Sequence, residues 1–277
     1  YPALLKEIPS SPYLIYTKGK FTEINSQPML AIVGSRKPTS YGKQVTYMLS
    51  RDLAQAGITV VSGMAIGIDA IAHESALEAE GKTIAVLGSS LEDKNIGPKI
   101  NFNLSRQIIE NGLLISEYPL GIESLPVNFP ARNRLMAGIT LGTIVVEAAE
   151  DSGSLITAQL ALEFNREVFA VPGSIFSPVS VGTNNLIRWG AKIATGIKDI
   201  LEENPIVEIP DYVISRVNGK YRDKPIIIDP EKPDAIAPTC LAHYSKDLGT
   251  RLLKDRNSRL GFRPFSIREY ARLQGFP

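Results

Sequence analysis

The stretch Leu30-Ala31-Ile32-Val33-Gly34-Ser35-Arg36 decides the fold class of this chain. Its apolar run ends abruptly in a glycine, a serine and an arginine. A short, continuous apolar run is typical of a strand that is buried on both faces of a parallel sheet. The glycine marks the turn that leaves the strand. The sequence therefore predicts a parallel strand whose carboxyl end carries small and basic residues.

The same pattern recurs along the chain, where further apolar runs alternate with helical patterns. The predicted strands are 30–33, 58–61, 83–87, 113–116, 143–146 and 167–171. The predicted helices are 41–55, 68–80, 99–110, 133–137, 155–165 and 184–189. Strands that alternate with helices form βαβ units. We therefore expect an extended Rossmann-like, doubly wound α/β fold with a mostly parallel sheet over residues 1–203.

The composition changes after Glu203, where prolines become frequent and the α/β rhythm stops. Proline cannot continue a helix or sit inside a sheet, so it breaks long elements. We expect a linker at 204–210 and a short, Pro-rich C-terminal appendage over 211–277. The prolines that carry this prediction are Pro205, Pro210, Pro225, Pro230, Pro233 and Pro238.

The bulk composition excludes several classes of protein. The 277 residues carry a net charge of +1, so the chain as a whole has no basic field for nucleic acid, and any such site must be a local patch. The single cysteine, Cys240, allows no disulfide within the chain and no zinc cluster, which fits a reducing compartment. No apolar run is long enough to span a membrane. We expect a cytoplasmic protein with no metal site and no membrane contact.

Glycine and serine recur where the predicted strands end. Glycine lets a backbone approach a ligand closely, and the free N–H groups at helix starts attract anions. Because the carboxyl ends of parallel strands share one edge of the sheet, we expect a polar, anion-binding cleft there. Neither a G-x-G-x-x-G fingerprint nor a P-loop is present, so no cofactor is expected. The strand ends are Gly34-Ser35, Ser62-Gly63 with Gly67, Gly88-Ser89, Ser152-Gly153-Ser154 and Gly173-Ser174.

The segment Asn128-Phe129-Pro130-Ala131-Arg132-Asn133-Arg134 combines cations with an aromatic ring. Cations contact phosphates and a ring stacks on bases, which together suit single-stranded nucleic acid. Arg36 adds a guanidinium that fits a phosphate. An alternative remains for each arginine. Arg36 can be an exposed charge at a helix start, and Arg132 and Arg134 can form structural ion pairs, for example with Glu147 or Glu150.

These residues, in this order, resemble the DprA/Smf family. The resemblance covers most of residues 1–203. The matching stretches are Ala31–Arg36, Ser62–Asp69 with Ala72-His73, Ser116–Pro119, Asn128–Pro130 with Arg132–Arg134, Glu147–Ala149, Ser152–Ala158 and Val171–Ser174.

The resemblance implies a homodimeric protein that binds single-stranded DNA without strong sequence preference. It also implies protection of incoming DNA in natural transformation and loading of a RecA-type recombinase, with no catalytic residue and no metal ligand. The DNA-binding residues predicted from the motifs and the resemblance are Gly34, Ser35, Arg36, Gly63, Gly67, Asn128, Phe129, Arg132, Asn133, Arg134, Ser152, Ser154 and Gly173.

Four other side chains carry separate predictions. His73 lies one helical turn after Asp69, and we interpret it as a hydrogen-bonded structural histidine and not as an acid/base pair with Asp69. Glu117 and Glu147 follow strands, and we expect them either to hold Arg132 or Arg134 or to order the cleft. We expect Trp189 to lie in the core.

The tail resembles a second family, the C-terminal part of DNA cytosine-5 methyltransferases. The residues that carry this resemblance are Lys232-Pro233, Ala237-Pro238-Thr239, Arg263–Glu269 and Ala271–Pro277. The nucleophile of that family is a cysteine in a Pro-Cys dipeptide, and none occurs here. We therefore expect no methyl transfer, an inert Cys240, a surface position for His243, and poor order in the tail unless it docks on the first domain.

Two alternative functions remain at this point. The first is a nucleotide-processing Rossmann-like enzyme, although the stretch Glu150–Ser154 lacks the Gly-Gly-x-Gly-Thr loop that would favour it. The second is a protein related to DNA cytosine-5 methyltransferases that lacks their catalytic motifs.

Overall fold

The computed structural model describes residues 1–21 and 24–201, together with three short strands nearer the C-terminus. The chain divides into two units, Tyr1–Leu201 and Glu202–Pro277. In the second unit, β10 (Leu252–Lys254) pairs in parallel with β9 (Ile227–Ile228) and antiparallel with β11 (Phe262–Pro264). The predicted linker, Cys240, His243 and most of the methyltransferase-like stretches lie outside the described residues.

The first unit is built on one eight-stranded sheet with the order β1-β5-β4-β3-β2-β6-β7-β8. All its strand pairs are parallel except the pair of β1 with β5. The strands are β1 (Tyr16–Gly19), β2 (Met29–Val33), β3 (Thr59–Ser62), β4 (Thr83–Leu87), β5 (Leu113–Ser116), β6 (Gly142–Val145), β7 (Glu167–Ala170) and β8 (Lys192–Ile193). The strand order reverses between β2 and β6. The doubly wound, mostly parallel α/β sheet expected from the sequence is confirmed.

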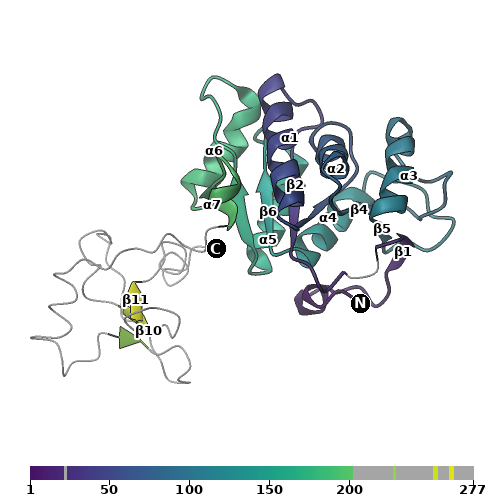
Figure 1. Ribbon diagram of the computed structural model, residues 1–277, viewed down its shortest axis with the longest axis horizontal. Coiled ribbons are helices and arrows are strands. Elements are labelled where there is room, and N and C mark those ends of the chain that lie inside the picture. The colour runs from purple at the N-terminus through teal and green to yellow at the C-terminus, as the bar shows by residue number, and fades with distance from the viewer. Residues whose placement is uncertain (22–23, 202–226, 229–251, 255–261, 265–277) are drawn as a thin grey trace, which may run out of the picture. The chain divides into compact units, whose positions relative to one another are not determined.

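Helices cover both faces of this sheet (Figure 1). The α-helices are α1 (Ser40–Gln55), α2 (Ile68–Glu78), α3 (Phe102–Asn111), α4 (Asn128–Ile139), α5 (Gly153–Glu163), α6 (Val181–Arg188) and α7 (Ile197–Leu201). Three 3-10 turns accompany them: η1 (Leu4–Glu7), η2 (Lys99–Asn101) and η3 (Pro178–Ser180). None of the described helices is long and apolar enough to cross a membrane.

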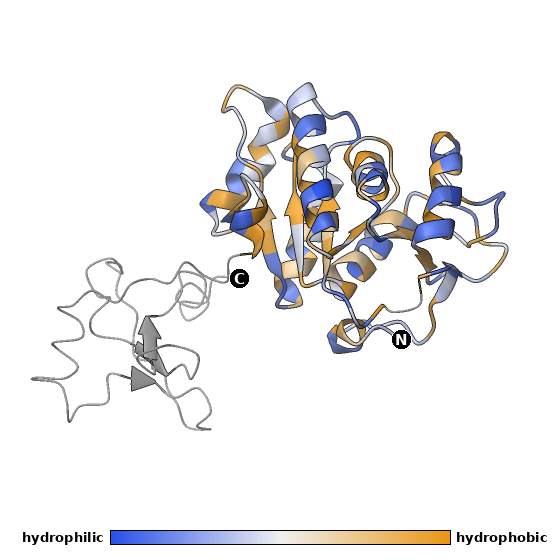
Figure 2. Ribbon diagram, in the orientation of Figure 1, coloured by the Kyte–Doolittle hydropathy of each residue, from blue (hydrophilic) through white to orange (hydrophobic). Residues whose placement is uncertain are grey.

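The two layers of core follow from the period-two geometry of the strands. In β2, Leu30 and Ile32 belong to the cluster that packs under α1 and α2, whereas Met29 and Val33 belong to the cluster under α4 and α5. Both faces of each central strand are therefore buried. This is why the strands consist of continuous apolar runs, and Figure 2 shows them as mostly hydrophobic between helices with hydrophilic outer surfaces.

Most predicted elements are present, with shifted boundaries. The helix predicted at 133–137 is α4, which begins at Asn128. Pro130 is compatible with it because the first turn of a helix needs no N–H donor there. The cluster Asn128–Arg134 thus lies inside the first two turns and not before the helix. The sequence analysis predicted no element at β1, β8, α7, η1 or η3, which are too short to show a period.

Of two side chains with separate predictions, Trp189 differs from expectation and His73 agrees with it. Trp189, which follows α6, is 72% exposed, so its predicted place in the core was wrong. His73 is buried and structural, as predicted, but its Nδ1 hydrogen-bonds to Thr83 Oγ1 at 2.7 Å. Thr83 already donates its proton to Val60 O, so His73 Nδ1 is the donor in this contact.

Candidate nucleic-acid interface

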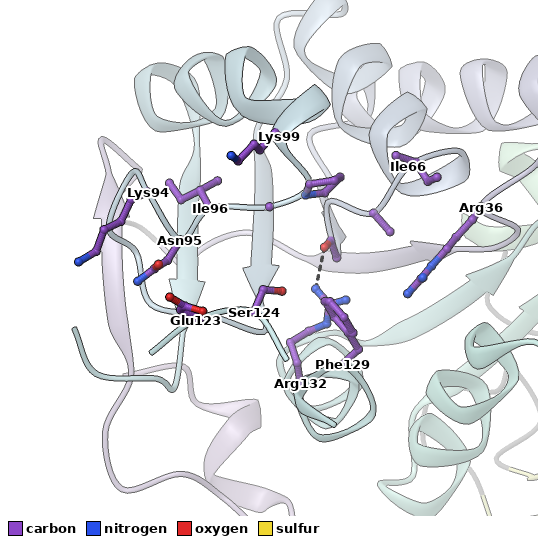
Figure 3. A pocket seen from close by; sticks show the side chains of 14 residues that line it. Arg36, Ile66, Lys94, Asn95, Ile96, Lys99, Glu123, Ser124, Phe129 and Arg132 are labelled. Atoms are coloured by element: carbon purple, nitrogen blue, oxygen red, sulfur yellow. Dashed lines mark hydrogen bonds between the residues drawn. The ribbon is translucent and has the colours of Figure 1, made fainter. Parts of the chain in front are cut away.

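A cleft of about 520 Å³ opens beyond the carboxyl ends of β2, β3, β4 and β5 (Figure 3). Its walls are the turn after β3, the long loop after β4, the loop after β5 and the first turns of α4. The lining residues are Arg36, Gly63, Ala65, Ile66, Lys94, Asn95, Ile96, Gly97, Pro98, Lys99, Glu123, Ser124, Phe129 and Arg132. Four of them are Lys or Arg, and Glu123 is the one Asp or Glu among them. The cleft therefore favours an anionic ligand.

Arg36 lies exposed at one end of this cleft, with its guanidinium carbon 5.6 Å from the centre of the Phe129 ring. A cation at this distance from an aromatic face is attracted by the ring quadrupole. Within the described part of the chain, no carboxylate pairs with Arg36. Its charge is thus positioned by a ring and left available to an anion from solution.

Arg132 forms the buried end of the same arrangement. It is 5% exposed, and its guanidinium carbon lies 6.0 Å from the Phe129 ring centre. Its Nη1 donates to Gly63 O at 2.7 Å and also to Val86 O. Burial lowers the pKa of Arg132 to about 10, with the carboxyl of Asp69 acting in the opposite direction and the charge of Arg36 adding to the decrease. Arg132 is therefore a fixed cation under the cleft.

The turn after β3 is held from both sides. Asp69 accepts from the backbone N–H groups of Gly63 at 3.2 Å and Ala65 at 3.3 Å, while Arg132 binds the carbonyl of Gly63. Burial raises the pKa of Asp69, and the charge of Arg132 and these hydrogen bonds oppose that increase. Gly67 has φ +85° and lies so close to Ser35 O that a Cβ would come within 2.5 Å of it. The glycines of this turn are needed for its shape.

The other predicted residues of the α4 cluster have structural partners. Asn128 is buried and donates to Gly88 O at 2.8 Å, and Asn133 donates to Gly153 O at 3.3 Å. Arg134 forms an ion pair with Glu117, so the expectation that Glu117 holds one of these arginines is confirmed. Of the cluster Asn128–Arg134, Phe129 and Arg132 line the cleft.

The predicted residues that follow β6 and β7 are not among the residues that line the cleft. Ser152 caps α5 by accepting from Ser154 N at 3.4 Å, and the two hydroxyls lie 2.8 Å apart. The N–H of Gly173 donates to Asn184 Oδ1 at 3.2 Å.

On the near side, Gly63 lines the cleft and Gly67 shapes its turn. Gly34 packs against Ile68, and Ser35 Oγ accepts from Lys37 N at 3.1 Å.

The crevice between β2 and β6, where doubly wound sheets take nucleotide phosphates, is closed by a side chain of this protein. The carboxylate of Glu147, buried after β6, accepts from Thr39 N at 2.9 Å and from Thr39 Oγ1 at 2.5 Å at the start of α1. Glu147 therefore supplies the anion that a helix N-terminus prefers. The alternative in which Glu147 pairs with Arg132 or Arg134 was wrong.

The sequence reading missed the loop after β4 as part of the site. Lys94, Asn95 and Lys99 line the cleft from this loop, opposite Phe129 and Arg132 (Figure 3). The sequence signal was present as two lysines in a turn-rich stretch, Asp93-Lys94-Asn95-Ile96-Gly97-Pro98-Lys99. It lay too far after the strand for a reading confined to the first residues of each strand end. The described residues contain no cluster of side chains that could hold a metal ion.

The sequence profile of a family described as DNA recombination-mediator protein A matches residues 1–205. The chain belongs to the DprA/Smf family. It is 42% identical to DprA of Bacillus subtilis over 205 residues, which cover 74% of this chain and 68% of that relative. It is 46% identical to the Smf protein of Synechocystis over 210 residues, which cover 75% of this chain but 51% of that relative. The chain thus spans about half to two thirds of these DprA/Smf relatives.

Two solved structures of DprA proteins resemble this one. DprA of Streptococcus pneumoniae matches with a TM-score of 0.69 and 42% identity, covering 73% of this chain and 70% of that chain. DprA of Helicobacter pylori matches with a TM-score of 0.67 and 34% identity, covering 72% of this chain and 90% of that chain, and its structure is described as showing a single-stranded DNA binding mode. The family expected from the motifs is confirmed.

Proposed function

We propose that the first unit binds single-stranded DNA in the cleft between Arg36 and Lys94, without catalysing a reaction. The observation that carries this proposal is the exposed Arg36 over the Phe129 ring, which has no carboxylate partner among the described residues, with the buried cation Arg132 on the same ring. Cations that follow a backbone, combined with an aromatic ring and apolar walls, suit a strand whose phosphates and bases are both accessible.

The relatives support a wider role for the whole protein. The family is described as a recombination mediator, and the H. pylori relative as a binder of single-stranded DNA. We infer that this protein, in the cytoplasm, protects incoming DNA strands in natural transformation and helps to load a RecA-type recombinase on them. The two alternatives have less support. Glu147 fills the crevice that a nucleotide would need, and the methyltransferase-like stretches mostly lie outside the described residues.

We further infer that the protein acts as a homodimer. Several large apolar side chains are exposed around α6, β8 and the loop before them, as on surfaces that a second copy covers. They are Ile175, Phe176, Val181, Trp189 and Ile193. Replacement of Trp189 by Glu should shift the mass measured by light scattering from dimer toward monomer, whereas an unchanged dimer would place the interface elsewhere.

The test of DNA binding is a fluorescence-polarisation titration of oligo-dT and of a matched duplex over a salt series. Wild type should prefer the single strand. The Arg36→Ala variant should bind more weakly and reduce the slope of log K against log salt by about one unit, because one phosphate contact is lost.

Arg51→Ala is the matched control, because Arg51 also lies over a ring, that of Tyr47 on α1, at 5.1 Å, but it does not line the cleft. Equal binding of single strand and duplex, or equal slopes for the two variants, would contradict the proposed site.

A further inference from the structure

The loop between β5 and α4 exposes a group of aliphatic side chains beside the cleft. They are Leu120, Ile122, Leu125 and Val127, within eight consecutive residues. Val127 is 71% exposed and Leu125 is 51% exposed. Single exposed aliphatic residues are common on proteins, but a cluster in one short loop marks a surface that contacts a partner.

The backbone of this loop is fastened, so the side chains stay exposed. Ser90 N donates to Ile122 O at 2.9 Å, which joins the loop to the segment after β4. Asn128 N donates to Leu125 O at 3.0 Å, and the Asn128 side chain donates to Glu123 O at 3.4 Å. These hydrogen bonds hold the backbone of the loop in one conformation, in which its aliphatic side chains are exposed.

The loop that carries these aliphatic side chains forms part of the cleft wall. Glu123 and Ser124, in the middle of the loop, line the cleft and lie between Asn95 and the Phe129–Arg132 pair (Figure 3). Ile66 lines the cleft from the turn after β3 and is partly exposed as well, and Ile100 is exposed next to the lining residue Lys99. The cleft thus has cations along its walls, and residues next to its lining residues in the chain carry exposed aliphatic side chains.

We propose that the Leu120–Val127 loop is a base-contacting rim, on which the nucleotides next to the cleft lay their bases. This rests on the proposed binding of single-stranded DNA. A single strand exposes the apolar faces of its bases and the methyl group of thymine, whereas a duplex keeps those faces stacked inside. Contacts to phosphates alone cannot distinguish the two in this way. The rim therefore supplies a preference for single strands that the cations do not.

The proposal predicts that the rim contacts the bases of the strand and not its phosphates. A Leu125→Ser/Val127→Ser double variant should bind oligo-dT about five- to tenfold more weakly, on the scale of losing one base contact, with an unchanged salt slope. The same variant should bind an abasic oligonucleotide of equal length as tightly as wild type, because that probe has phosphates without bases. Position 127 precedes α4 and is 71% exposed, so serine there should have little effect on the stability of the fold.

Leu141→Ser is the matched control. Leu141 is 47% exposed, close to the 51% of Leu125, but it precedes β6 at the opposite edge of the sheet. The Leu141→Ser variant should bind oligo-dT and the abasic oligonucleotide with wild-type affinity. Wild-type affinity for oligo-dT in the double variant would overturn the rim while leaving the cleft in place, and would assign the loop to a protein partner. An equal loss on the abasic probe, or a reduced salt slope, would also overturn it. Failure of wild type to prefer single strands would instead contradict the proposed function itself.

Discussion

The two halves of the carboxyl edge of the sheet carry the same kinds of residue but differ in whether their charged side chains are hydrogen-bonded within the protein. On the β6 side, the carboxylate of Glu147 is buried and satisfied by Thr39 at the start of α1. On the β3–β5 side, Arg36 is exposed with no described carboxylate partner, and Arg132 is bound to carbonyls. A closed set of hydrogen bonds stabilises a fold, whereas an unpaired cation in a cleft stays available to a ligand.

The first prediction tests the β6 side of the edge by removing its buried carboxylate. Glu147→Ala removes a buried acceptor and leaves the donors of Thr39 unpaired, so the free energy of unfolding should fall by about 3 kcal/mol, as for hydrogen bonds to a charged group. Urea denaturation measures this change. The exposed neighbour Glu150→Ala should change stability by less than about 0.5 kcal/mol. A similarly small change in the free energy of unfolding for both variants would show that the Glu147 carboxylate does not stabilise this edge of the sheet.

The second prediction concerns the interior beneath the cleft. Burial lowers the pKa of His73 to about 3, with the charge of Arg132 adding to the effect. The unfolded chain takes up this proton below pH 6.5 while the folded protein does not, so stability is fully present above pH 6.5 and is lost as pH falls toward 3. Between pH 8 and pH 5 the loss from His73 should be about 2 kcal/mol.

Urea denaturation of wild type and His73→Gln at both pH values isolates this contribution, because every other titrating group is common to the two proteins. The difference in stability between them should shrink toward pH 5. A difference that does not change with pH would show that folding does not lower the pKa of His73.

The third prediction compares two lysines that line the cleft. Lys99 lines the cleft without a described carboxylate partner, whereas Lys94 lies 3.5 Å from a carboxylate oxygen of Glu92. Lys99→Ala should weaken oligo-dT binding by about 1 kcal/mol at moderate salt and lower the salt slope by about one unit. Lys94→Ala should have a smaller effect on both. Equal effects in the same polarisation titration would mean that pairing with Glu92 does not lessen the contact of Lys94 with DNA.

The smallest expected effect comes from the one carboxylate that lines the cleft. Glu123 is exposed and repels phosphates, so Glu123→Gln should strengthen oligo-dT binding about twofold, in the range of an exposed charge interaction. The gain should disappear at high salt. Weaker binding by this variant would instead indicate that Glu123 accepts a hydrogen bond from a base.

The sequence predicted the fold more completely than the site. Continuous apolar runs such as Leu30–Val33 and Thr83–Leu87 identified parallel strands because a strand buried on both faces must be apolar at every position. Of the predicted site residues, Arg36, Gly63, Phe129 and Arg132 line the cleft. Ser152, Ser154 and Gly173 share the expected chemistry but lie beyond the reversal of strand order. Local composition does not reveal on which side of that reversal a strand end falls.

What the sequence by itself determined was the strand and helix pattern, the family and the kinds of group at the carboxyl edge, since these depend on residues close together in the chain. Only the tertiary structure decided which charges are paired. Glu147 meets Thr39 across 108 residues and Arg132 meets Gly63 across 69, and Lys94, from the loop after β4, lines the same cleft as Phe129. A charged side chain stabilises the fold where it meets a hydrogen-bonding partner within the protein, and it is available to a ligand where it does not. Long-range packing alone decides which of the two applies.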